Sequence, residues 1–223
     1  MRTRLMLSGA MVLLLAGSAL ADPKVSREIR VEASSGSIDR VIVEVGVSEL
    51  EIRNGQAGSV VAHGMVKREY ESSEDIKQAQ SILNQSDIEI EIDGSRAIVR
   101  RKLGPDADGW RVRNQTQYTI IVEVPVGVDI EVQQKVGEIT VDGMFGSIDV
   151  DLGVGEVKIR TPKKSVREVS SRVRIGENRI HTGDRIITRE GVLSGKTEFF
   201  NDGGTSRLHV AVGVGEIDIE LIP

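Results

Sequence analysis

The sequence predicts an all-β fold, specifically a β-solenoid similar to a single-stranded β-helix, with one short helix. Three observations predict it: apolar and polar residues alternate along most of the chain, a nine-residue repeat occupies its C-terminal half, and one segment has helical spacing. Aromatic residues are only 3% of the 223 residues, so the core must consist mainly of Val, Ile and Leu. An antiparallel β-sandwich is the alternative that the same strand lengths allow.

Residues 1–21 are predicted to be a secretory signal peptide rather than part of the fold. Arg2 and Arg4 form a basic start, Leu5–Ala16 is apolar, and Ala19–Ala21 has the small-x-small pattern of a cleavage site. An uncleaved membrane anchor is the alternative, but the apolar stretch is short of the roughly 20 residues that a spanning helix needs.

The predicted location is the periplasm, or the outside of the cell. The chain has no cysteine, so it lacks the residue through which bacterial envelope proteins receive a lipid anchor. No second apolar run is long enough to span a membrane, so we expect no transmembrane segment after residue 21. Removing Arg2 and Arg4 would leave 27 of the 29 basic residues against 34 acidic ones, a net charge of −7. An acidic protein of this kind is not expected to bind nucleic acid.

Residues 22–223 are predicted to form one repetitive β domain, of which residues 22–117 are the less regular part. Strands are expected at Val41–Val45 and Ser59–Arg68, where apolar residues recur. A hairpin is expected where two alternating segments, Ile88–Ile92 and Ala97–Arg100, flank the turn Asp93-Gly94-Ser95.

One helix is predicted near residues 73–83. Ser72-Ser73-Glu74-Asp75 has the pattern of a capping box, and Ile76, Ala79 and Leu83 follow at helical spacing. We expect this helix to cover an open end or one face of the sheet, because exposed sheet edges need protection. A partner-binding helix is the other interpretation.

Residues 118–223 carry the regular repeat. Tyr118, Ile120, Val122 and Val124 first alternate along one predicted strand. A unit with two β-branched residues then recurs every nine residues, and the unit at Gly153–Ile159 is nearly copied far downstream. The repeating positions are Ile130, Ile139, Ile148 and Val157, then Val132, Val141, Val150 and Ile159, with further copies at Gly213–Ile219 and, more weakly, at Val45–Ile52.

Each unit is predicted to be a strand of about five residues, followed by a connector of about four. Gly137, Ile139 and Val141 share one face and point inward, whereas Glu138 and Thr140 point outward. Glycine at the start of each unit would let the chain turn a corner against the core. The constant phase of the units, and the lack of Asn-Gly hairpin signals between them, favour the solenoid over the sandwich.

These blocks together resemble the bacterial "putative adhesin" family of unknown function, whose members carry repeated Gly-[Asp/Glu]-[Ile/Val]-x-[Ile/Val] strands. The resemblance covers nearly all of residues 22–223 and implies a single-stranded β-helix exposed in the cell envelope. It implies no catalytic residues, and Ser48 departs from it by replacing the usual glycine. The blocks that carry it are Val45–Ile52, Ile88–Ile92, Tyr118–Val128, Gly137-Glu138-Ile139 and Val212–Ile219.

No catalytic, cofactor-binding or metal-binding residue is predicted. His63, His181 and His209 are isolated in the sequence, and a chain without cysteine offers no thiolate. Stacked carboxylates such as Glu138, Asp149 and Glu156 could attract a cation weakly, but solvated acids that limit aggregation are the expected interpretation.

Two segments stand apart from the repeat. Thr161–Arg174 is the one basic stretch, with five Lys and Arg residues, and is expected to be a solvated connector rather than a site for an anionic envelope polymer. Leu103–Asn114 is expected to be a loop in which Trp110 fills a local hydrophobic gap, although the ring could also stack on a sugar or a peptide.

The predicted function is that of a non-catalytic, adhesin-like structural or binding module whose partner is an envelope protein or polymer. An envelope-stress regulatory partner is the first alternative. A carbohydrate-active β-helix enzyme is the second, and it would need a groove lined by Asp149, Lys158 and their neighbours. The sequence leaves the oligomeric state open.

Overall fold

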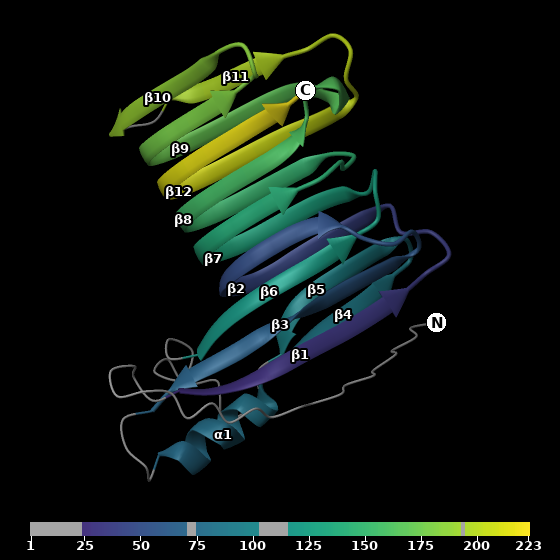
Figure 1. The fold of residues 1–223 in the computed structure, drawn as a ribbon, viewed down its shortest axis with the longest axis vertical. Coiled ribbons are helices and arrows are strands. Elements are labelled where there is room, and N and C mark those ends of the chain that lie inside the picture. The colour runs from purple at the N-terminus through teal and green to yellow at the C-terminus, as the bar shows by residue number, and fades with distance from the viewer. Residues whose placement is uncertain (1–23, 71–74, 103–115, 193–194) are drawn as a thin grey trace.

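The computed structural model describes residues 24–70, 75–102, 116–192 and 195–223, and it is all-β with one short helix, as predicted (Figure 1). The predicted signal peptide and Trp110 lie outside these residues. Within the described residues, no helix is long and apolar enough to cross a membrane.

The strands form one large mixed sheet with the order β1-β3-β6-β2-β7-β8-β12-β9-β10; β5 also pairs with β2, β4 with β5, and β11 with β9. This arrangement fits the predicted solenoid and the sandwich alternative equally well. The strands are β1 (Lys24–Ser34), β2 (Arg40–Asn54), β3 (Ser59–Glu69), β4 (Asp87–Asp93), β5 (Arg96–Lys102), β6 (Thr116–Val124), β7 (Asp129–Asp142), β8 (Ile148–Pro162), β9 (Val166–His181), β10 (Ile186–Val192), β11 (Lys196–Phe200) and β12 (Ser206–Ile222).

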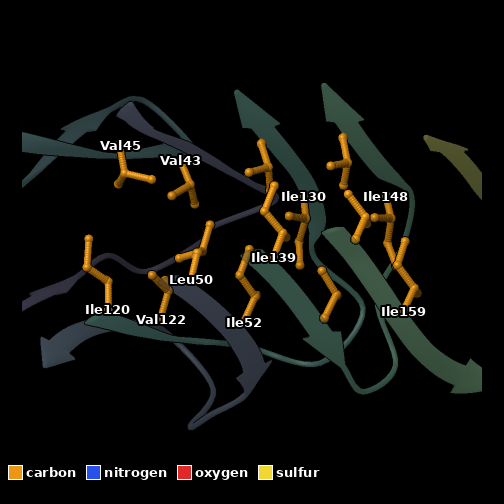
Figure 2. Packing of buried hydrophobic residues seen from close by; sticks show 14 of the residues in the cluster. Val43, Val45, Leu50, Ile52, Ile120, Val122, Ile130, Ile139, Ile148 and Ile159 are labelled. Atoms are coloured by element: carbon orange, nitrogen blue, oxygen red, sulfur yellow. The ribbon is translucent and has the colours of Figure 1, made fainter. Parts of the chain in front are cut away.

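Five long parallel strands, β2, β7, β8, β12 and β9, form the regular part, and each of them bends in the middle. In β7, Ile130, Val132 and Gln134 are buried, but so are Ile139 and Val141, which an unbent strand would place on the opposite face. Both halves of β7 therefore face one core. Figure 2 shows the same arrangement in β2, where Val43 and Leu50 point toward each other from the two halves.

The bend corrects the predicted strand length. We expected five-residue strands with a connector after each one, but β7, β8 and β12 contain 14, 15 and 17 residues. Every second predicted connector is a bend inside a continuous strand, because pairing with the neighbouring strands continues past it. Two residues nine positions apart therefore lie either on the two halves of one strand or on the second half of one strand and the first half of the next. Residues that pair side by side in neighbouring strands are 18 positions apart, as Ile130 and Ile148 are.

The five long strands are not stacked in chain order. The C-terminal strand β12 lies between β8 and β9 and pairs in parallel with both (Figure 1). Shorter strands continue the sheet beyond the stack. At one end β5 pairs with the first half of β2 and β6 with the second, while at the other end β10 and β11 pair with the two halves of β9.

The sequence prediction missed β1, β9 and β10, and the first two show a common cause. Thr161–Arg174, expected to be a connector, contains the end of β8, a short 3-10 turn at Lys163–Ser165 and most of the first half of β9. The other is β1, an edge strand that pairs only with β3 among the described strands. In both, a polar residue occupies an inward position that breaks the apolar alternation: Arg27 in β1 and Ser171 in β9 are buried.

The helix α1 spans Ile76–Gln85, so it begins three residues later and ends two residues later than predicted. Its N-cap residue, Asp75, makes no side-chain capping hydrogen bond, and the rest of the predicted capping box lies outside the described residues. Ala79, Ile82 and Leu83 are buried, and the helix contacts β1 and β3, so it covers the sheet near its β1 edge, as expected (Figure 1).

Candidate interaction surface

A column of glycines forms the bend of the long strands. Gly137, Gly155, Gly215 and Gly176 pair in register across β7, β8, β12 and β9. Their φ angles lie between +130° and +142°, a region that residues with a side chain rarely adopt. A Cβ atom on Gly155 would also lie 1.8 Å from the carbonyl oxygen of Gly137. The predicted role of glycine as a corner residue is confirmed at these positions.

Ser48 replaces glycine at the first bend, in β2, and a side chain from β7 compensates for it. Ser48 is buried, and its Oγ donates a hydrogen bond to Oε1 of Gln134 at 3.0 Å. Nε2 of Gln134 in turn donates to the carbonyl oxygen of Ser48 at 2.7 Å. The imperfect repeat noted in the sequence is thus a closed polar pair, which keeps these buried groups hydrogen-bonded.

An exposed apolar column, which we call the ridge, runs along the outside of the bend. Its members pair in register across the five long strands, and all are β-branched aliphatic residues. They are between 37% and 47% exposed, although most outward positions beside them carry polar or charged residues. The ridge consists of Val47, Val136, Val154, Val214 and Ile175.

A column of five glutamates, the glutamate column, runs beside the ridge, two residues further along each strand. Its members pair in register and point outward; they are Glu49, Glu138, Glu156, Glu216 and Glu177. Like charges at directly paired positions repel, so this column costs folding free energy. Part of that repulsion is relieved on the same strands, where Lys158 lies 2.9 Å from Glu156 and Arg179 pairs with Glu177. Hydrogen bonding to these carboxylates raises the pKa of both cations.

On the other side of the ridge, the column that precedes it carries cations and glycines. Lys135 and Arg174 are exposed there, at the β7 and β9 positions. Gly153 and Gly213 fill the positions between them, because a Cβ on Gly153 would meet the carbonyl oxygen of Lys135, and one on Gly213 that of Gly153. The ridge is therefore bordered by negative charge on one side and by sparse positive charge on the other.

The outer face beyond the glutamate column is hollowed and carries charges of both signs. A shallow hollow of about 450 Å³ lies over the second halves of β7, β8, β12 and β9. Arg160 lies 3.9 Å from Asp142 and 3.5 Å from Glu220, and His181 lies 3.1 Å from Asp218. The charged groups at this hollow are engaged with one another.

The residues named for the enzyme alternative are not brought together. Asp149 lies on the first half of β8 and Lys158 on the second, and both point outward from a core that the two halves enclose. They therefore lie on opposite outer faces and cannot line one groove. Among the described residues, no group of three or more His, Asp or Glu side chains is placed to hold a metal ion.

The other residues singled out from the sequence are dispersed. His63 lies 3.6 Å from Glu123, His181 borders the hollow, and His209 pairs in register with Asp149 on the opposite outer face. Glu138 and Glu156 are neighbours in the glutamate column, whereas Asp149 is not part of it.

One buried polar pair was not foreseen from the sequence. Ser171 and Asn178, on the two halves of β9, both point inward, and Ser171 Oγ lies 3.0 Å from Asn178 Oδ1. Nδ2 of Asn178 is buried without a hydrogen-bond partner. The segment Gly176–Ile180 is a further copy of the repeat in which Asn178 replaces Ile or Val, and comparing it with Gly215–Ile219 could have revealed it.

Comparisons with known proteins give weak structural similarities. No protein-family model matches the sequence, and no curated protein is significantly similar to it. A putative cell adhesion protein from Clostridium sporogenes is similar in structure, with 14% identity, a TM-score of 0.49, and coverage of 88% of this chain and 100% of that chain.

Two further solved structures are similar at lower scores. A putative adhesin from Bacteroides fragilis has 9% identity and a TM-score of 0.25, with 86% of this chain and 96% of that chain covered. A putative lipid binding protein from Parabacteroides distasonis has 9% identity and a TM-score of 0.23, with 88% and 97% covered. At TM-scores below 0.5, none of these similarities assigns this chain to a family.

Proposed function

We propose that the protein is an exported, non-catalytic β-solenoid module that presents its repetitive outer surface to another component of the cell envelope. The observation that carries this proposal is the register of the five long strands. Register repeats the same kind of residue at two outward positions, so that the surface carries one uniform apolar column and one uniform acidic column. Such surfaces suit binding of extended or repetitive partners.

Two further observations support the non-catalytic part of the proposal. The charged side chains that pair at the hollow are each more than a third exposed, so none lies in the desolvated environment that is typical of active-site acids and bases. Asp149 and Lys158, which the enzyme alternative requires in one groove, lie on opposite faces. Export rests on the sequence of residues 1–21.

The proposal is tested by photo-crosslinking in intact cells. A photoreactive residue replaces Thr140, which borders the hollow, and the same residue replaces Asp149, which is exposed on the opposite outer face, as a matched control. We expect one discrete adduct with an envelope protein or polymer from Thr140 and none from Asp149. Adducts no different from those of an unrelated exported protein would contradict the proposal, as would product release from a panel of envelope polysaccharides.

A further inference from the structure

We propose that the ridge is a self-association surface, through which two copies of this chain form a parallel two-fold dimer. This interface is separate from the contact proposed at the hollow, and either can exist without the other. The ridge members are Val47, Val136, Val154, Val214 and Ile175.

Nothing in the bend itself requires apolar side chains at the ridge. A β-branched residue suits an extended backbone, but threonine would meet that need without exposing an extra methyl group to water. All five positions are nevertheless Val or Ile. At the spacing of about 4.8 Å between strands, they form a continuous apolar line about 19 Å long. A contiguous apolar surface of this kind is typical of a contact site, whereas single exposed apolar residues are ordinary.

The two borders of the ridge complement each other in charge. The glutamate column lies on one side, and Lys135 and Arg174 lie on the other. If two copies face each other with their strand stacks running in the same direction, the glutamate column of each copy meets the cationic border of the other. If the stacks run in opposite directions, glutamates face glutamates and repel. Charge therefore selects a second copy in the parallel orientation.

The parallel orientation also determines which residues meet across the interface. A two-fold axis parallel to the stack places each strand opposite its own copy, without a shift along the axis. Lys135 then faces Glu138 of the second copy, because both are β7 residues, and Arg174 faces Glu177, because both are β9 residues. At the β8 and β12 positions the border residues are Gly153 and Gly213, which leave room for the glutamates. The contact is narrow, so we expect a dissociation constant in the micromolar range.

Analytical ultracentrifugation of the purified chain up to 100 μM tests the association. Val136→Thr/Val154→Thr keeps β-branched residues and should raise the dissociation constant at least tenfold, with an unchanged circular dichroism spectrum. Asp149→Asn, an exposed position five residues before Val154 on the same strand, should leave it unchanged. Lys135→Glu should weaken association at least tenfold, and Lys135→Glu/Glu138→Lys should restore it, because the swapped charges again face each other.

Cysteine crosslinking tests the orientation, and the absence of native cysteine makes each introduced thiol unique. Single variants with cysteine at Val47, Val154 or Ile175 are treated with a short bismaleimide. The parallel dimer predicts a crosslinked dimer from all three. Crosslinking from Val154 alone would indicate opposed stacks and overturn the proposal. A monomer at 100 μM would also overturn it, even if the hollow captures an envelope partner; a dimer without such a partner would contradict only the proposed function.

Discussion

Adding one methyl group to the central bend should destabilise the whole stack. In Gly155→Ala, the new Cβ atom would lie 1.8 Å from the Gly137 carbonyl oxygen, and the φ angle of +141° is strained for alanine. The strain costs about 1–3 kcal/mol. Moving the Gly137 carbonyl away weakens a sheet hydrogen bond worth about 1 kcal/mol. We therefore expect a loss of about 2–4 kcal/mol in the free energy of unfolding.

Gly127→Ala is the matched control. Gly127 also has a positive φ angle, +81°, but no atom lies within 4 Å of an added Cβ. It should cost only the backbone strain, about 1–2 kcal/mol. Urea unfolding followed by circular dichroism gives both values. If Gly155→Ala loses no more stability than Gly127→Ala, the close packing of the glycine column is not what shapes the bend.

Four further predictions follow from individual contacts, each measured by urea unfolding. Ile139→Ala should cost about 2–5 kcal/mol because the side chain is fully buried, whereas the outward Thr140→Ala should cost little; equal losses would contradict the assigned faces. Asn178→Val combined with Ser171→Ala should stabilise the protein by roughly 1 kcal/mol, because together they remove a buried amide nitrogen without a partner and do not leave the Ser171 hydroxyl unpaired; a loss of stability would show that this amide is satisfied. Gln134→Leu should lower the free energy of unfolding by about 1–3 kcal/mol, because it leaves the buried Ser48 hydroxyl without a partner. Adding Ser48→Gly should recover part of this loss in a double-mutant cycle, and simple additivity of the two single losses would contradict the coupling between Gln134 and Ser48. The hydrogen bond from Arg53 lowers the pKa of Glu123, so the stability from this pair is present at neutral pH and is lost as the pH falls through the lowered pKa. Glu123→Gln should therefore lower the free energy of unfolding by under about 1 kcal/mol at pH 7. If the variant is still less stable than the unsubstituted protein by the same amount at pH 2, the assignment is contradicted.

The strands of the repeat could be predicted from the sequence because their inward residues keep one period. Ile139 and Val141 alternate with Glu138 and Thr140, and the structure buries the first pair and leaves the second outward. The corner role of glycine was also predictable, since Gly137 and Gly155 stand in phase with the inner face. Arg27 in β1, and Ser171 and Asn178 in β9, are polar residues at inward positions. They interrupt the alternation of apolar and polar residues, so the sequence no longer indicates a strand there.

The order of the strands could not be predicted, because pairing between distant segments leaves little trace in local alternation. A repeat of nine residues is compatible with one strand per repeat or with two repeats in each bent strand. Only the observed pairing between residues 18 positions apart, such as Ile130 and Ile148, decides between them. The near-identity of Gly213–Ile219 and Gly153–Ile159 indicated similar environments without indicating that the two segments are neighbours.

The ridge was missed for a related reason. Val136 and Val154 each precede a glycine. With a connector predicted between separate strands at these positions, the sequence did not indicate that the two residues align on one surface. Bending the strands at Gly137 and Gly155 places these residues outside the core, and the register aligns them. A search for apolar residues immediately before the repeated glycines would have found the column.

The most direct test of the account is the order of the stack, because every column on the surface depends on it. The order β8-β12-β9 makes Glu216 a neighbour of both Glu156 and Glu177 and separates the latter two by a strand. Paired cysteines at 156 and 216, or at 216 and 177, should form intramolecular disulfides on mild oxidation, since adjacent strands bring their Cα atoms within the usual range. A pair at 156 and 177 should not. A disulfide between 156 and 177, with none to 216, would mean that the strands stack in chain order and would contradict the columns on which the surface is built.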